Sequence, residues 1–456
     1  MFSKIYNTEL ETDYKNAEGF NRYTDDIMAE YNQCIEEGID IEEYKALFES
    51  VAAMKNGAEK TKMSDVIFDI VMSSEIRKDY KYNEPDDLES IRELRKKHSY
   101  KKNQSDEATL KDKILGAWTG RAVGCLLGKP LEGIRSDELI PFLKETGNYP
   151  MHRYVLSSDV TDEVASHYKF GLKNKVYGDT ADGMPVDDDT NYTVLYQMLV
   201  EKSGRDFTTS DVGRLWLSSQ PVTAYFTAER IAFVNLINCL TPPATAIYKN
   251  VCREWIGAGI RGDYFGYINP GAPEAAAEMA YKDARLSHVK NGIYGEMFVS
   301  AMLSIAAVND NIEDIILGGL AEIPASSRLY EAVMKVYTDY KNGVSLEDTF
   351  RNIHSLWDEH TDHGWCHMIS NAMIVTAALL YGEGDFGKSI CTAVGMAFDT
   401  DCNGATVGSV LGMRGGTDII DDYWKKPLNG KIHTSITGVG TVNIEELAEK
   451  TMTHIK

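Results

Sequence analysis

The sequence lacks the features of a membrane, secreted or nucleic-acid-binding protein. Its longest apolar stretch, near residues 297–308, is too short and too often interrupted by serine to span a bilayer. Residues 1–16 are polar and acidic, unlike a signal peptide. The net charge of −22 leaves little basic surface to neutralise the phosphates of nucleic acids or anionic membranes. We therefore expect a cytoplasmic protein that binds neither nucleic acids nor membranes.

The cysteine pattern argues against a disulfide framework. The cysteines are odd in number, scattered, and form no CxxC pair. This is typical of reduced, mostly buried thiols in a cytosolic protein. The seven residues are Cys34, Cys125, Cys239, Cys252, Cys366, Cys391 and Cys402.

Strand-like alternation is also scarce, and nothing resembles a βαβ unit. Apolar side chains instead recur at helical spacing, as in the stripe from Tyr192 to Leu199. The spacing predicts a mainly α fold. Pro85 and the basic run at 95–102 indicate a connector whose charges are solvated rather than a binding patch. We predict a helical N-terminal extension and connector over residues 1–105 and a second, larger domain over 106–456.

Glycine, by contrast, is abundant where helices are predicted. Two segments carry glycine at every fourth position, which costs about 1 kcal/mol per residue relative to alanine inside a helix. The resulting bare stripe lets another backbone, or a ligand, approach closely. Tight helix packing is one interpretation and a site beside the helices is the other. The glycines are Gly116, Gly120, Gly124 and Gly128, and then Gly404, Gly408 and Gly412.

Two acidic clusters are the most informative feature of the chain. Asp187, Asp188 and Asp189 precede one apolar helical stripe, and Asp399 and Asp401 precede the second glycine segment. One aspartate would be an ordinary helix N-cap, and an exposed loop would explain a pair, but five carboxylates at two helix starts exceed both explanations. Carboxylates buried side by side cost several kcal/mol each unless a cation neutralises them. Oxygen ligands favour a hard ion such as Mg²⁺ or Mn²⁺.

Glu132 follows the first glycine segment and could contribute a further carboxylate to such a site from a third part of the chain. A carboxyl group near a metal centre can act as general acid or base, or can gate access. Taken alone, a glutamate in a loop is usually a solvated surface residue.

The histidines offer a competing metal site. His360, His363 and His367 are spaced by three and four residues, which suits zinc on one helical face. Gly364 interrupts the run and no HExxH motif is present. Capping, or packing near the active site, is the favoured interpretation of these histidines.

The acidic motifs and their flanks resemble those of the ADP-ribosylglycohydrolase family, which includes the dinitrogenase-reductase-activating glycohydrolases. The similarity runs from about Lys111 to the C-terminus. A Gly-x-Pro-x-Glu turn is matched at 128–132, a (Ser/Thr)-Asp-Asp-Thr motif at 187–190, and an Asp-Thr-Asp-Thr motif at 399–402. A central Ser/Thr-His element is matched at 287–288.

The resemblance implies an all-α, orthogonal multi-helix bundle with a centre of two Mg²⁺ or Mn²⁺ ions, and the N-terminal helical extension falls outside this common core. It implies hydrolysis of the N- or O-glycosidic bond of a small-molecule or ADP-ribosylated substrate, with Glu132 and Asp188 as catalytic residues. His288 would line the substrate pocket. The implied metal ligands are Asp187, Asp188, Asp189, Asp399 and Asp401.

Two departures from the family pattern concern the metal ligands. Asp187 replaces the usual serine or threonine and adds negative charge, and Cys402 stands where a threonine oxygen often binds a metal. The alternatives are a catalytically silent ADP-ribose-binding relative and a hydrolase of a small nucleoside-like N-riboside. An isoprenoid-type pyrophosphate enzyme is disfavoured because neither Asp188 nor Asp189 has a carboxylate three or four residues on.

Overall fold

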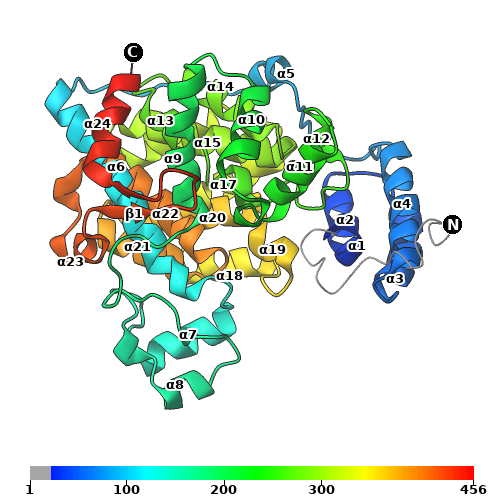
Figure 1. Cartoon of the computed structure of the whole chain (residues 1–456), viewed down its shortest axis with the longest axis horizontal. Coiled ribbons are helices and arrows are strands. Elements are labelled where there is room, and N and C mark those ends of the chain that lie inside the picture. The colour runs from blue at the N-terminus through cyan, green and yellow to red at the C-terminus, as the bar shows by residue number, and fades with distance from the viewer. Residues whose placement is uncertain (1–21, 456) are drawn as a thin grey trace.

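Helices make up almost all of the regular structure. The computed structural model describes residues 22–455, and the predicted all-α class is confirmed (Figure 1). The exception is a small antiparallel sheet in which β1 (Lys431–His433) pairs with β2 (Thr441–Asn443), with Ile432 opposite Val442. No helix in the described part of the chain is long and apolar enough to cross a membrane.

Five long helices, buried on nearly every face, form the centre of the molecule. A helix surrounded by others has no polar face, so its sequence lacks the amphipathic pattern of a surface helix. These helices are α6 (Glu107–Gly128), α9 (Asp188–Ser203), α15 (Lys290–Ala306), α20 (Met368–Tyr381) and α22 (Thr400–Gly415).

Shorter helices surround this centre and shield it from solvent. They are α10 (Thr209–Ser219), α11 (Thr227–Ile237), α12 (Ala244–Ile247), α13 (Asp263–Tyr267), α14 (Pro273–Ala284), α16 (Ile312–Leu320), α17 (Arg328–Lys341), α18 (Leu346–Leu356), α19 (Asp362–Cys366), α21 (Phe386–Gly395), α23 (Asp422–Lys425) and α24 (Ile444–His454). A lobe containing α7 (Ser136–Glu145) and α8 (Asp162–Ser166) projects from one end of the body (Figure 1).

The two glycine stripes face each other across the contact between α6 and α22. A Cβ atom added at Gly116 would lie 2.5 Å from the carbonyl oxygen of Gly412, and Gly120 and Gly124 meet Gly408 and Gly404 in the same register. The stripes therefore serve close backbone packing, and they bring the end of α6 against the start of α22.

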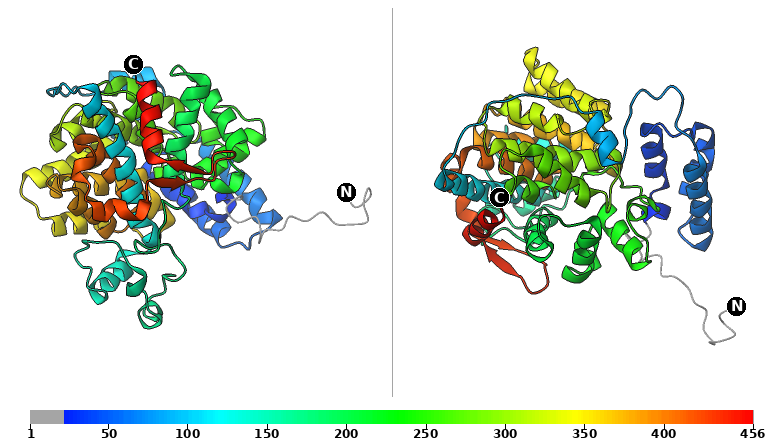
Figure 2. Two further views of the ribbon diagram at one scale, coloured as in Figure 1. Left: turned by 60° about the vertical axis from the view of Figure 1, so that its left-hand side comes forward. Right: turned by 90° about the horizontal axis from the view of Figure 1, so that it is seen from above.

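The N-terminal helices stand beside the main body (Figures 1 and 2). Buried ion pairs attach them: Arg253 lies 2.6 Å from both Glu30 and Glu37. These buried ion pairs therefore hold this part of the extension directly against the body. Its helices are α1 (Arg22–Asp25), α2 (Ile27–Glu36), α3 (Lys45–Ala52), α4 (Ala58–Ser73) and α5 (Leu88–Glu93).

Candidate active site

The first acidic cluster lies at the N-terminus of α9. Asp187 is the N-cap, and its Oδ1 accepts the backbone N–H of Asp189 at 2.9 Å. Its other oxygen, Oδ2, accepts a hydrogen bond from Lys129 Nζ at 2.5 Å. Asp188 is half-buried and faces the cavity described below, whereas Asp189 is fully buried behind it. Capping thus explains one of the three aspartates, as expected.

The second acidic cluster lies at the N-terminus of α22 and follows strained backbone. Ala397 and Phe398 adopt positive φ angles of 61° and 57°, which cost on the order of 1 kcal/mol or more for each non-glycine residue. Side chains hold this turn in place: Trp365 Nε1 donates to the Phe398 carbonyl at 2.6 Å. The Asp399 N–H donates to Asn371 Oδ1 at 3.2 Å. These hydrogen bonds hold the strained turn in one conformation and so fix the position of the Asp399 backbone.

The glycine packing joins the second cluster to Glu132. Thr400 Oγ1 donates to the Gly128 carbonyl at 2.9 Å, and a side chain on Gly128 would collide with the backbone of residues 400–401. The turn that carries Glu132 begins at the next residue, so the glycine stripe sets the distance between Glu132 and the aspartates of α22.

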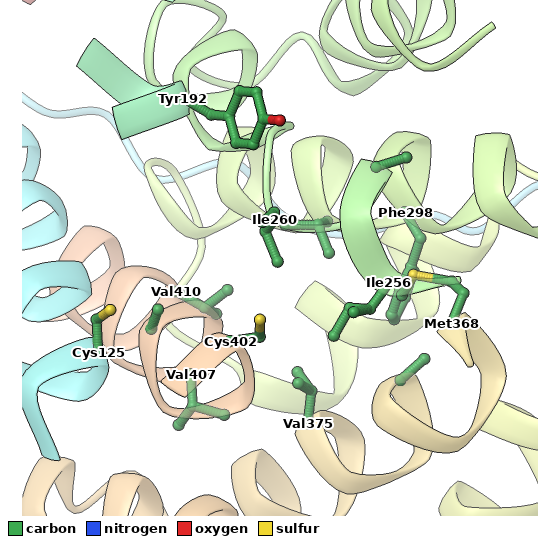
Figure 3. Close-up of a cluster of buried hydrophobic side chains, with 14 of the residues drawn as sticks. Cys125, Tyr192, Ile256, Ile260, Phe298, Met368, Val375, Cys402, Val407 and Val410 are labelled. Atoms are coloured by element: carbon green, nitrogen blue, oxygen red, sulfur yellow. The ribbon is translucent and has the colours of Figure 1, made fainter. Parts of the chain in front are cut away.

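Glu132 and four of the five predicted aspartates line one cavity of about 460 Å³. This volume is within the range of small-molecule sites. Part of its wall is apolar, and Figure 3 shows Cys402 on α22 with its sulfur directed toward Ile256 and Ile260. The cavity is lined by acidic, basic, aromatic and sulfur-containing side chains, among them Lys129, Glu132, Asp187, Asp188, Phe226, Trp365, Cys366, Asp399, Asp401 and Cys402.

Mutual repulsion and burial disturb the ionisation of these carboxyl groups. Burial, followed by the charge of Glu132, raises the pKa of Asp399 to about 8. Burial also raises the pKa values of Asp188, Asp189 and Asp401 well above their usual range. The side chain of Glu132 is exposed to the cavity, and the charge of Asp401, followed by partial desolvation, raises its pKa to about 8. Without a cation, several of these groups hold protons at neutral pH.

Two basic residues that the motifs did not identify lie among the acids. The fully buried Arg121 on α6 pairs with Asp189 at 3.1 Å and with Asp263 at 3.0 Å. Lys129 pairs with Asp187, and the two cations face more carboxyl groups than they can neutralise. An arginine inside a glycine-rich apolar helix is the sequence signal that could have pointed to this pair.

The residues present fit a cation. Asp189 Oδ2 and Asp401 Oδ1 are buried oxygens without a hydrogen-bond partner in residues 22–455. Such atoms are costly when they ionise and lack a ligand. The carboxylates that would hold metal are Asp187, Asp188, Asp399 and Asp401, with Asp189 on the side already held by Arg121.

His288 is placed away from these groups. It is buried, its Nδ1 lies 2.8 Å from Ser287 Oγ, and it is not among the residues that line the described cavity. Burial, together with the charge of Arg261, holds its pKa well below the usual range, so the ring is neutral. The structure therefore does not place His288 in the substrate pocket.

The predicted histidine cluster separates in the structure, and two members meet the N-terminal extension. His360 is exposed, whereas His363 and His367 are buried and face Glu36 of α2 at 3.1 and 3.7 Å. Each ring accepts a hydrogen bond at Nδ1 at 3.2 Å, from Trp255 Nε1 for His363 and from the Ile369 N–H for His367.

These acceptor bonds argue against zinc. A neutral imidazole that accepts at Nδ1 carries its proton on Nε2, so the His363 Nε2–H is directed at the Glu36 carboxylate. His367 Nε2 lies between Glu36 at 3.7 Å and Glu254 at 3.8 Å, without a hydrogen-bond partner in the described residues. Zinc would need the same two nitrogens as lone-pair donors. His367 instead caps α20, in agreement with the capping interpretation.

Comparison with known protein families gives a match over most of the chain. A sequence profile of the ADP-ribosylglycohydrolase family matches residues 106–455. The chain therefore belongs to the ADP-ribosylglycohydrolase family, and this membership supports a glycohydrolase-type function.

A solved structure described as an ADP-ribosylglycohydrolase-related protein complex is similar at 16% sequence identity and a TM-score of 0.44. The match covers 76% of this chain and 98% of that one. No curated protein matches this sequence.

Proposed function

We propose that the protein is a divalent-metal-dependent hydrolase of the N- or O-glycosidic bond in an ADP-ribosyl or related ribosyl substrate. The observation that carries this proposal is the convergence of Glu132, Asp187, Asp188, Asp399 and Asp401 on one cavity from three distant segments. Family membership supports the same class of reaction.

The carboxylates would hold one or two divalent ions, of which Mg²⁺ and Mn²⁺ suit the oxygen donors. When bound, such ions would act as Lewis acids that coordinate ribose hydroxyls and activate water. Arg121 keeps the Asp189 side of the cluster rigid. Lys129 limits the repulsion at Asp187 while the site is free of metal.

Glu132 is the group we assign to proton transfer. Its pKa of about 8 in the metal-free site lies near neutrality, which is where an acid–base group transfers protons most effectively. It borders the same cavity as the aspartates, beside Asp401, where it can exchange a proton with an attacking water or with the leaving group. Asp188, which also faces the cavity, is the aspartate best placed to contact substrate.

The remaining wall suits a nucleoside. Phe226 is 48% exposed at the cavity, and Trp365 lies on the side of α19. Flat aromatic faces of this kind can pack against a base or another planar leaving group. A ribosyl compound would thus present its hydroxyls to the acids and its planar part to this wall.

Hydrolysis assays with and without metal test the proposal. The purified protein is incubated with ADP-ribosyl-arginine, ADP-ribosyl-serine and a panel of N-ribosides, first with Mg²⁺ or Mn²⁺ and then with chelator, while free sugar is measured. Metal-dependent release from at least one substrate is expected. Asp188→Asn and Asp401→Asn should abolish it, whereas Asp422→Asn, at a fully exposed side chain, should retain it.

A silent binding module is the alternative, because Lys129 neutralises part of the acidic charge without any metal. Tight binding of ADP-ribose without hydrolysis of any substrate under either metal would favour the binding module over the enzyme.

A further inference from the structure

Two sulfur-containing groups of potential metal ligands meet at one aspartate. Cys125, Asp187, Asp189 and Asp401 have ligand atoms within 4.8 Å of one another, and so do Asp399, Asp401 and Cys402. Asp401 belongs to both groups, so they are adjacent positions of one centre. Each position contains one thiol, and this departs from a purely oxygen-based site.

The two positions differ in access and in charge. At the first, Lys129 and Arg121 already pair with Asp187 and Asp189, and Cys125 is buried away from the cavity lining. At the second, Asp399, Asp401 and Cys402 all border the cavity. The second position is therefore the one that an ion can reach without displacing a protein cation.

Within the described residues, the second position also has an unpaired donor atom, Asp401 Oδ1, which it shares with the first position. Asp401 is 3% exposed, and its Oδ1 has no hydrogen-bond partner in the described chain. A further sulfur lies close by, because Cys366 Sγ is 3.9 Å from Asp399 Oδ2 and borders the same cavity. The donors around this point are thus carboxylate oxygen and sulfur together.

We propose that the position formed by Asp399, Asp401 and Cys402 binds a thiophilic divalent ion of the Zn²⁺, Co²⁺ or Fe²⁺ class in preference to Mg²⁺, with Cys402 Sγ as a ligand. Thiolate sulfur is a soft donor that favours zinc-class ions, whereas Mg²⁺ takes oxygen almost exclusively. On binding, the Cys402 S–H proton is released to solvent and a sulfur–metal bond forms. The inference rests on the proposed function for the existence of the centre and changes the identity of one of its ions.

Cobalt is a suitable probe because a cobalt–thiolate bond produces a charge-transfer absorption band in the near ultraviolet. The full-length, metal-free protein is titrated with Co²⁺ alone. We expect the band to appear, to be removed by added Zn²⁺, and to survive a large molar excess of Mg²⁺.

Cysteine variants test whether Cys402 Sγ is the sulfur that produces the band. Cys402→Ser should remove the band and weaken Co²⁺ binding by about 10- to 100-fold, as expected at minimum for damage to a metal site. Cys402→Thr, which offers oxygen in place of sulfur, should also lack the band but should bind Mn²⁺ or Mg²⁺ better than the parent protein. Cys239→Ser changes an exposed thiol and should leave the band unchanged. Circular dichroism of each variant checks that the fold is retained.

Two results would overturn the proposal: a folded parent protein that shows no thiolate band while it binds Mg²⁺, or a band that persists in both Cys402 variants. Failure of the proposed function is distinguishable, because it would appear as absence of hydrolysis with every metal while the cobalt band remained.

Discussion

Lys129 and Asp187 form an ion pair, 2.5 Å from Nζ to Oδ2, at the wall of the cavity that also contains the other acids. The Asp187 side chain is almost fully buried, whereas Lys129 is about a quarter exposed. Although burial lowers the pKa of Lys129, the charges of Asp187 and Asp401 raise it further, so the amine is charged. The ammonium group is therefore a built-in cation that offsets part of the acidic charge.

Replacing this lysine should make the fold depend on metal. In Lys129→Met the buried Asp187 carboxylate loses its partner, and we expect the free energy of unfolding without metal to fall by about 2 kcal/mol. A divalent ion should restore most of that loss. Urea denaturation with and without the ion measures both effects, and Lys425→Met on the surface is the control. Equal stability of parent and variant in chelator would contradict the assigned role.

The pH dependence of stability should differ between the metal-free and metal-bound protein. Glu132 and Asp399 have folded-state pKa values of about 8, above the ordinary 4.5 and 3.8. A carboxyl group with a raised folded pKa is fully stabilising below its unfolded pKa, and this contribution is lost as the pH rises toward the folded value. The melting temperature in chelator should therefore fall between about pH 5 and pH 8. A divalent ion should raise it more at pH 8 than at pH 5, whereas an equal rise at both values would refute this account.

The glycine contact between α6 and α22 should tolerate no side chain. In Gly124→Ala the new methyl group would collide with the backbone of Gly404 and force the helices apart, which should cost at least about 3 kcal/mol. Gly171→Ala is the matched control, because Gly171 has open space around it and no positive φ. Thermal melting compares the two. Parent-like melting of Gly124→Ala would show that the helices can separate freely.

Much of the site could be predicted from the sequence because its determinants are local. The Asp187–Asp189 and Asp399–Asp401 clusters were recognisable as helix starts. Tight helix packing, one of the two interpretations of the glycine spacing, is the contact that brings Glu132 to the second cluster. The role of Arg121 between Asp189 and Asp263 could not be assigned in this way, since Asp263 lies far along the chain and in no motif. The placement of His288 is likewise a tertiary property.

In the histidine segment, the sequence allowed a site that the three-dimensional contacts argue against. The spacing of His363 and His367 is compatible with zinc. Only the three-dimensional partners show which ring nitrogen carries the proton: Trp255 and Glu36 for His363, and the Ile369 N–H for His367. The link to Glu36 also connects the N-terminal extension to α19, whose Trp365 and Cys366 border the cavity.

Glu36 should consequently stabilise the junction between the extension and the active-site wall. Burial lowers the pKa of His367 and keeps its ring neutral, and the hydrogen bond from His363 helps to hold the pKa of Glu36 below its usual value although burial opposes it. Glu36→Ala should leave the buried His363 Nε2–H unsatisfied and lower the free energy of unfolding by about 1–3 kcal/mol. Glu42→Ala, which removes an exposed carboxylate from its pair with Arg77, should cost less than about 1 kcal/mol. Urea denaturation measures both variants, and equal losses would show that the Glu36 contact has no special role in anchoring the extension.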